Sequence, residues 1–128
     1  MREILFRGKR IDGRGWANGF YISCGGPCIL DDDDMFFGAD GVEGMYSVDS
    51  STVGQYTGLK DRNGVRIFEG DVVAFDGGRF VVEYFESRMG FGFSGLKGRG
   101  VVSGFTMMDL EHLEVIGNVH DNPELLEV

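Results

Sequence analysis

The chain of 128 residues has twenty-one acidic and twelve basic residues, a formal net charge of −9, and 42% hydrophobic residues. This length supports one hydrophobic core without help from a disulfide or a metal, and the negative charge disfavours nucleic acid and anionic lipid as partners. No apolar run approaches the roughly 18 residues that a membrane span requires, and the N-terminus lacks the apolar core of a signal peptide. We therefore expect a single cytoplasmic domain, residues 1–128, without a membrane span.

Glycine is the outlier of the composition, with 22 residues, whereas proline occurs only twice. A disordered linker with this much glycine would contain few apolar residues, but this chain has eleven phenylalanines. Glycine in such a context is typical of turns and bulges between short strands. The composition therefore predicts many short strands joined by turns and bulges. Together with the doubly apolar strand, the closing segment and the resemblance described below, it leads us to expect a mostly β protein, a small barrel-like antiparallel fold of SH3-like character, with a short C-terminal helix.

The start of the chain predicts a hairpin. Residues 2–7 alternate between the two faces of a strand, and Asp12–Gly15 has the composition of a turn. Trp16–Ile22 then reads as the returning strand, with a bulge at Gly19. We expect these two strands to pair with each other.

Residues 23–53 have weaker signals. Cys24–Cys28 has the glycine and proline of a turn, and Asp31–Asp34 is an acidic run typical of a solvated loop. Met45–Val48 is short and suits a strand. We expect a variable loop with one or two short strands here.

The central stretch has the densest local signals of the sequence. Gln55–Lys60 and Val65–Phe68 are extended runs, and the Asp61–Gly64 segment between them contains the Asn-Gly pair that favours a type I′ hairpin turn. Glu69–Asp71 breaks the second run, because its central glycine permits a sharp bend, and Val72–Phe75 follows as another strand.

The next strand is apolar on both faces. Arg79–Phe85 follows a tight turn at Asp76–Gly78, and this pattern indicates burial on both sides, by a small barrel or by another subunit. Residues 88–108 predict two short strands, with a tip at Lys97–Gly100.

The end of the chain predicts a last strand, Glu114–His120, and a short helix over residues 121–126. Because this helix has barely two turns, we expect Leu125 and Leu126 to dock against the rest of the protein. The expected parts are an N-terminal hairpin (1–22), a variable segment (23–53), a β-barrel core (54–120) and a C-terminal docking turn (121–128).

No set of residues predicts catalysis. Cys24 and Cys28 are separated by three residues rather than the two of a redox motif, and the aspartates that follow would disfavour a thiolate. His112 and His120 lack the spacing of a zinc site, and Asp31–Asp34 lacks that of a calcium loop. We expect no enzyme activity, no cofactor, no metal and no catalytic residues; a hydrolase with an unrecognised carboxylate pair stays an alternative.

Gly90–Gly95 matches two motifs in part. It fits the glycine spacing of a dinucleotide-binding turn, but the glycines after it exclude the required helix. It also resembles the Gly-Phe-Gly-Phe centre of an RNA-recognition strand. The alternative interpretation is a glycine-bent strand in which Phe91 and Phe93 face the core. A nucleic-acid-binding accessory module is thus an alternative function, and its basic residues would be Arg2, Arg7, Lys9, Arg10 and Arg14.

Three blocks of the sequence resemble the YopX family of small phage and prophage proteins. They are Met1–Arg7, the central Gly54–Gly64 with Ile67–Val73, and the closing Glu114–Leu126. The resemblance implies a mostly β fold with barrel character and a tendency to self-associate. It brings no established activity, cofactor or catalytic residue.

We therefore expect a non-enzymatic, oligomer-forming β protein that binds a phage or host protein in the cytoplasm of a bacterium. Polar residues beside the central bends are the candidate partner surface, although such side chains also commonly bond to nearby backbone. These residues are Gln55, Tyr56, Thr57, Lys60, Asp61, Glu69 and Asp71.

Overall fold

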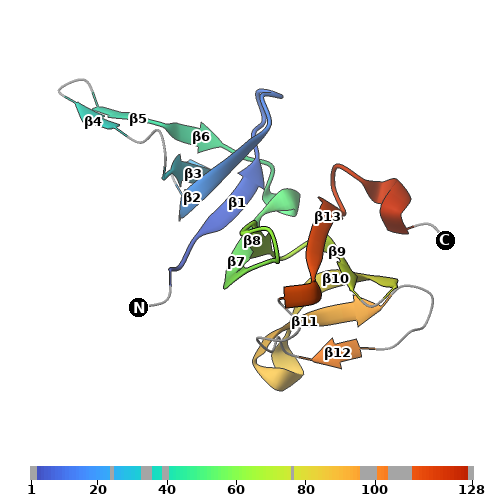
Figure 1. The fold of residues 1–128 in the computed structure, drawn as a ribbon. Helices are drawn as coiled ribbons and strands as arrows, with labels where there is room; N and C mark the ends of the chain where they lie inside the picture. The colour runs from blue at the N-terminus through green and yellow to red at the C-terminus, as the bar shows by residue number, and fades with distance from the viewer. Residues whose placement is uncertain are drawn as a thin grey trace. The chain divides into compact units, whose positions relative to one another are not determined.

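The computed structural model describes residues 3–23, 25–32, 36–38, 41–75, 77–95, 101–103 and 111–126. The described residues are mostly antiparallel β structure, and the chain divides into two compact units, Met1–Tyr56 and Thr57–Val128 (Figure 1). None of the helices in this part of the chain has the length and apolar character needed to cross a membrane.

The N-terminal unit is a sheet with the strand order β6-β3-β2-β1-β7, and β4 and β5 form a separate two-stranded ladder. Each neighbouring pair is antiparallel. The elements are β1 (Phe6–Lys9), β2 (Trp16–Ser23), β3 (Pro27–Asp31), β4 (Phe36–Gly38), β5 (Gly41–Glu43), β6 (Met45–Ser47) and the 3-10 helix η1 (Ser50–Thr52).

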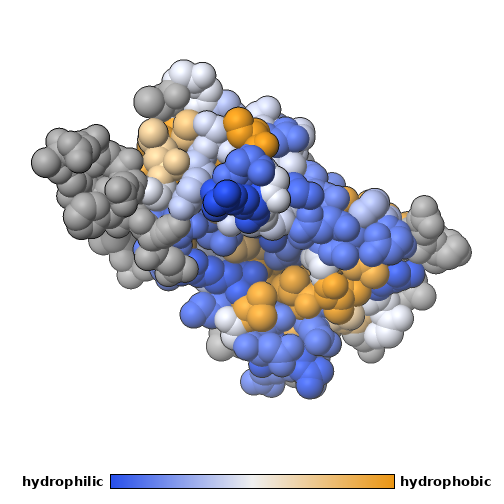
Figure 2. All heavy atoms as spheres, turned by 90° about the horizontal axis from the view of Figure 1, so that it is seen from above, coloured by the Kyte–Doolittle hydropathy of each residue, from blue (hydrophilic) through white to orange (hydrophobic). Residues whose placement is uncertain are grey.

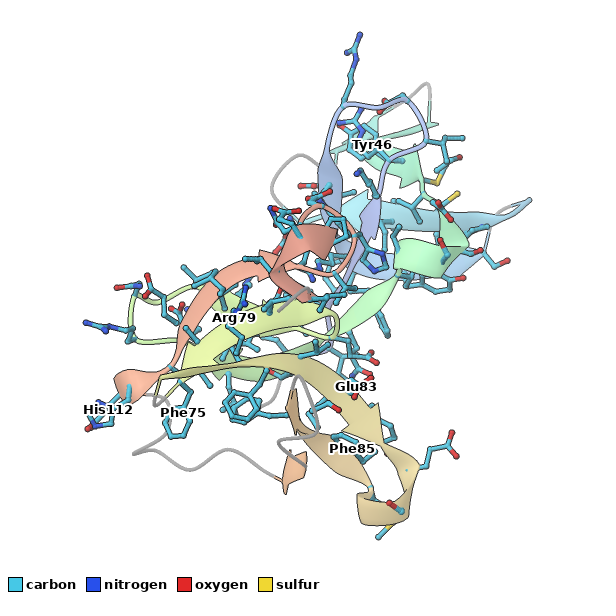
Figure 3. All side chains as sticks on the ribbon, turned by 90° about the vertical axis from the view of Figure 1, so that its right-hand side faces the viewer. Tyr46, Phe75, Arg79, Glu83, Phe85 and His112 are labelled. Carbon is cyan, nitrogen blue, oxygen red and sulfur yellow. The ribbon has the colours of Figure 1, made fainter. Side chains whose placement is uncertain are left out.

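The core of this unit lies on one face of its sheet. Ala17, Ile29 and Val48 are buried there, and Phe6, Tyr46 and Val53 pack around them. The guanidinium carbon of Arg10 lies 3.7 Å from the ring centroid of Tyr46, which is labelled in Figure 3. A basic side chain thus covers an edge of the apolar cluster through a cation–π contact.

β7 (Gly54–Lys60) crosses the boundary between the units. Its first residues pair with β1, and its later residues lead into the hairpin with β8 (Arg66–Phe68). The C-terminal unit then contains a five-stranded sheet of order β12-β11-β10-β9-β13. Its elements are β9 (Asp71–Phe75), β10 (Gly78–Phe85), η2 (Glu86–Arg88), β11 (Gly90–Gly95), β12 (Val101–Ser103), β13 (Glu114–Asn118) and η4 (Pro123–Leu126).

One face of the five-stranded sheet carries the core of the C-terminal unit. Its buried members are Ile67, Val73, Phe80, Val82, Phe93 and Leu113, with Leu59, Phe75 and Val115 packed against them. Val82 and Phe93 face each other across β10 and β11, and the rings of Phe80 and Phe93 lie 5.9 Å apart. The phenylalanine surplus therefore fills this core in part.

The predicted barrel is wrong for the described residues. The five-stranded sheet ends in β12 on one side and β13 on the other, and no ladder joins these two edges in the part of the chain that is described. In the N-terminal unit an isolated bridge between Arg10 and Val48 joins β1 to the residue after β6, without a strand-length ladder. Many glycines have positive φ, which is typical of turn residues. They therefore form turns and do not bend the strands into a closed barrel.

The predicted C-terminal helix is also wrong, because Pro123–Leu126 forms a 3-10 helix. Asn118 and Asn122 explain the short turn. The Asn122 amide donates to the Asn118 carbonyl (2.9 Å), and the Asn118 amide donates to the Asn122 side chain (3.2 Å). These bonds bind the segment to the end of β13 and leave few residues for a helix. Leu125 lies against Gly117, where a Cβ atom would collide with it.

Other strand predictions have mixed outcomes. The hairpin of β1 with β2 is confirmed, but its register is regular at Gly19, so no bulge occurs there. Gly19 is required instead because a Cβ atom would collide with the Leu30 carbonyl of β3. Residues 23–53 contain four strands rather than one or two, and Asp31 ends a strand instead of belonging to a solvated loop.

Candidate functional site

The turn between β7 and β8 differs from the predicted type I′ geometry. Gly64 has a φ of 78°, but Asn63 has no positive φ. The Gly64 amide donates to the Asp61 carbonyl (3.1 Å), and the Asp61 amide donates to the Val65 carbonyl (2.9 Å). This is the pattern of a type I turn followed by a left-handed glycine, the usual three-residue alternative to the two-residue hairpin loop.

The carboxylate of Asp61 holds this turn together. Its Oδ1 accepts hydrogen bonds from the amides of Asn63 (2.8 Å) and Val65 (2.9 Å). Its Oδ2 accepts one from the amide of Val115 (2.9 Å), at a sequence separation of 54 residues. Because Asp61 is buried and bonded on both oxygens, its charge is directed at main-chain amides of its own unit.

Thr57 and Asp71 also bond to the main chain of their own unit. The Thr57 hydroxyl donates to the Ile67 carbonyl (2.8 Å), across β7 and β8. Oδ2 of Asp71, which is 1% exposed, accepts a hydrogen bond from the Phe68 amide (2.8 Å). Thr57 therefore supports the pairing of β7 with β8, and Asp71 supports the bend between β8 and β9, roles that polar residues beside turns often have.

The other predicted surface residues do not gather in one place on the surface. Tyr56 is buried, and Gln55 and Glu69 are half-buried. Lys60 is the exposed member of the set. The structure thus uses Thr57, Asp61 and Asp71 to hold the β7–β8 hairpin and the β8–β9 bend, and it leaves Lys60 exposed.

A second surface was not predicted from the sequence. It is the β10–β11 tip, residues 83–91, where β10 and β11 are joined by η2. Tyr84 and Phe91 face each other across the two strands and form an edge-to-face ring pair at 5.3 Å, with Tyr84 47% exposed. Glu83 and Phe85, labelled in Figure 3, lie along the same end of β10. An aromatic pair beside solvent is typical of a protein-binding surface.

Met89 closes this tip in an unfavourable conformation. It has φ 51° and ψ 45°, and it is the single non-glycine residue with positive φ in the described part of the chain. A left-handed conformation costs a non-glycine residue about 1–2 kcal/mol. The side chain is also 85% exposed, so packing within the described residues does not offset this cost. The sequence has no pattern from which a left-handed conformation at Met89 could have been predicted.

The hydrophobic surface of the molecule is divided into patches. The face shown in Figure 2 is mostly hydrophilic, with separate hydrophobic areas. The large apolar side chains that are exposed among the described residues include Ile4, Ile11, Phe20, Tyr21, Met45, Val65, Tyr84, Met89 and Ile116. Phe20 and Met45 flank Leu30 on three neighbouring strands, so the N-terminal sheet also has an apolar row on one face.

The β1–β2 loop, residues 10–15, combines charge with one exposed apolar residue. Arg10 forms an ion pair with Asp12 (2.5 Å), and the Asp12 carboxylate also accepts the Arg14 amide (3.0 Å). The hydrogen bond from Arg10, followed by that from the Arg14 amide, lowers the pKa of Asp12 below its ordinary value. Ile11 is 71% exposed between these charges.

The residues considered for redox and metal chemistry do not converge. Cys28 is a buried free cysteine in β3, and Cys24 lies outside the described residues, as do Asp33, Asp34 and the predicted tip at Lys97–Gly100. His112 is exposed and His120 is half-buried. No group of three or more His, Cys, Asp or Glu side chains in the described ranges could hold a metal ion.

The Gly90–Gly95 segment is strand β11, not a dinucleotide-binding turn. Phe93 is fully buried in the core opposite Val82, and Phe91 packs on Tyr84. The core-facing interpretation is therefore correct for Phe93, which has no exposed ring face on which a base could stack.

Comparison with known proteins agrees with this β architecture. The YopX family model, described as YopX protein, matches residues 29–127. The crystal structure of protein EF1440 from Enterococcus faecalis is similar with a TM-score of 0.66 and 25% sequence identity, over 99% of this chain and 100% of that chain. A search among curated proteins found no match. The family match contains the central and closing blocks and leaves residues 1–7 outside. Because the match covers well over half of the sequence, this chain belongs to the YopX family.

Proposed function

We propose that this chain is a non-enzymatic, oligomer-forming β protein of phage or prophage origin, which acts by protein–protein binding in the cytoplasm of its bacterial host. The observation that supports the proposal is the β10–β11 tip. There the chain exposes Tyr84 and Met89, and Met89 is held in a conformation that costs free energy. A residue that is unfavourable for the isolated chain is explained if its side chain contacts another protein.

The second face of β10 gives further support. Phe80 and Val82 of this strand are buried in the core, whereas Val81 and Phe85 on the opposite face are only half-buried. Apolar side chains that a chain leaves partly in water are available to a partner subunit. The doubly apolar pattern of β10 is therefore consistent with cover by another protein molecule.

The proposal is tested by measuring the molar mass of the purified full-length chain. Size-exclusion chromatography with light scattering, over a wide range of protein concentration, should give a mass above the 14.1 kDa of one chain, rising with concentration. A mass that stays at 14.1 kDa at every concentration would remove the oligomer from the proposal.

A further inference from the structure

The β10–β11 tip and the β1–β2 loop have opposite characters. Glu83 and Glu86 are exposed at the tip, and within the described residues neither carboxylate has a side-chain partner. The sequence places two acidic residues and one basic residue between positions 83 and 89. The tip therefore presents apolar side chains beside two exposed acidic residues, with an excess of one negative charge over residues 83–89.

The β1–β2 loop presents apolar surface beside positive charge. Residues 7–14 contain four basic residues and one acidic residue, in a chain with a net charge of −9. Asp12 is paired with Arg10, whereas the exposed Arg14 interacts with the Asp12 carboxylate through its amide and its charge, without an ion pair of its own that the structure describes. Ile11 projects into solvent between these two arginines.

We infer that the β10–β11 tip of one copy docks on the β1–β2 loop of a second copy, with Met89 against Ile11 and the carboxylates of Glu83 and Glu86 toward Arg14. This inference rests on the proposed function, because it names the contact by which the chain self-associates. Opposite charges favour this pairing, since residues 83–89 have one more acidic than basic residue, and a tip that met another tip would bring two patches with an excess of negative charge together. The exposed apolar side chains at both places lose contact with water when they meet.

The contact joins two different patches rather than one patch to its own copy. Each chain has one tip and one loop, so the contact can repeat from copy to copy into a ring or a filament, or form twice in a two-fold dimer whose chains exchange tip and loop. In each case a chain with a weakened tip still offers an intact loop to a chain with a weakened loop. This complementation makes the inference testable without a known partner.

The first experiment measures the association of two single variants by light scattering, with the full-length chain in each case. Met89→Gly removes the apolar side chain of the tip, and Ile11→Ser removes that of the loop. Each should weaken self-association at least about tenfold. Met89→Gly also relieves the positive φ, so its thermal stability at a concentration where both chains are monomeric should not fall, and loss of association cannot be attributed to unfolding. Val65→Ser, at another exposed turn position, is the matched control and should leave the association unchanged.

The second experiment mixes the two weakened variants. The Met89→Gly chain has an intact loop, and the Ile11→Ser chain has an intact tip. In the mixture this loop and this tip should bind each other, so light scattering should give a two-chain species with twice the 14.1 kDa chain mass. An isologous contact through either patch predicts no such gain on mixing. Raising the salt from about 0.05 to about 0.5 M should weaken wild-type association, because the Debye length becomes shorter.

The outcomes separate this inference from the proposed function. A wild-type chain that is monomeric at all concentrations overturns both. A wild-type oligomer that is insensitive to Met89→Gly and to Ile11→Ser overturns the docking contact and leaves the oligomer in place. An oligomer that both variants weaken, with recovery of a two-chain species on mixing, supports the contact between tip and loop.

Discussion

The β7–β8 turn and the β10–β11 turn both end in a residue with a left-handed backbone, but they meet this requirement in opposite ways. The first uses Gly64, and the carboxylate of Asp61 satisfies the surrounding amides. The second uses Met89, with φ 51° and an exposed side chain. The first turn is therefore explained by the needs of the fold alone. The second costs stability, and this cost is the reason for proposing that Met89 contacts another protein.

The largest effect is expected at the β7–β8 turn. Asp61→Ala should lower the free energy of unfolding by about 3 kcal/mol, because three main-chain amides lose a charged acceptor. Urea denaturation followed by circular dichroism measures the change. Asp61→Asn is the matched variant. The side-chain oxygen of asparagine can still accept hydrogen bonds from two of the amides, whereas its NH₂ group faces the third amide and cannot accept one. We therefore expect about half of the loss in unfolding free energy that Asp61→Ala causes. A loss below about 0.5 kcal/mol in Asp61→Ala would show that the carboxylate does not hold the turn.

Gly64→Ala isolates the backbone requirement of the same turn. A Cβ atom at Gly64 would meet open space, so the cost comes from the φ of 78° alone and should be about 1 kcal/mol. The urea midpoint should fall accordingly. Gly77→Ala, with φ 75° and equally open surroundings, should cost about the same. If neither midpoint moves, positive φ is not costly in this chain, and the argument about Met89 fails with it.

Met89→Gly is the reverse experiment at the β10–β11 turn. Relief of the left-handed strain is partly offset by the larger entropy of glycine in the unfolded chain, so a net gain of about 0.5 kcal/mol is expected. Met89→Asn should also stabilise, because asparagine tolerates this conformation with less unfolded-state entropy. Thermal denaturation at a concentration where the chain is monomeric measures both. Destabilisation by both variants would mean that the methionine side chain supports the folded monomer.

The smallest effect belongs to the exposed β1–β2 loop. The folded-state pKa of Asp12 is lowered, first by the Arg10 hydrogen bond, so the stabilisation is present above the ordinary carboxyl pKa of about 4 and is lost as the pH falls through the folded pKa. The melting temperature of Asp12→Asn should therefore be slightly below that of wild type at pH 7. The difference should shrink as the pH falls through the folded-state pKa of Asp12, where the carboxylate becomes protonated. A difference that is independent of pH would exclude the charge of Asp12 as its cause.

Local signals predicted much of the fold. The Asn-Gly pair placed the β7–β8 hairpin, and alternation placed β2, β9 and β10, because these features act over a few residues. The signals failed where pairing is distant in the chain. β3 was not predicted, because it has no strong pattern of its own and forms through cross-strand neighbours such as Ile29 with Tyr46, whereas the short strand predicted at Met45–Val48 is confirmed as β6. The barrel failed for a similar reason, since closure depends on which edges meet.

The candidate site shows the same division. The sequence indicated polar residues beside the central bends as a candidate partner surface, with bonds to nearby backbone as the alternative. Such bonds occur at Thr57, Asp61 and Asp71, whereas Lys60 is exposed. The β10–β11 tip had no sequence signal, because a methionine in a left-handed conformation is recognised only from the backbone.

The sequence by itself determined that the chain is mostly β, where its glycine-containing turns lie, and to which family it is similar, since these depend on residue type and short spacing. The tertiary structure alone decided that the strands form open sheets, that the Asp61 carboxylate reaches Val115, and that Met89 is left in solvent at positive φ. The physical reason is that burial, long-range hydrogen bonds and sheet closure depend on residues that meet only after folding.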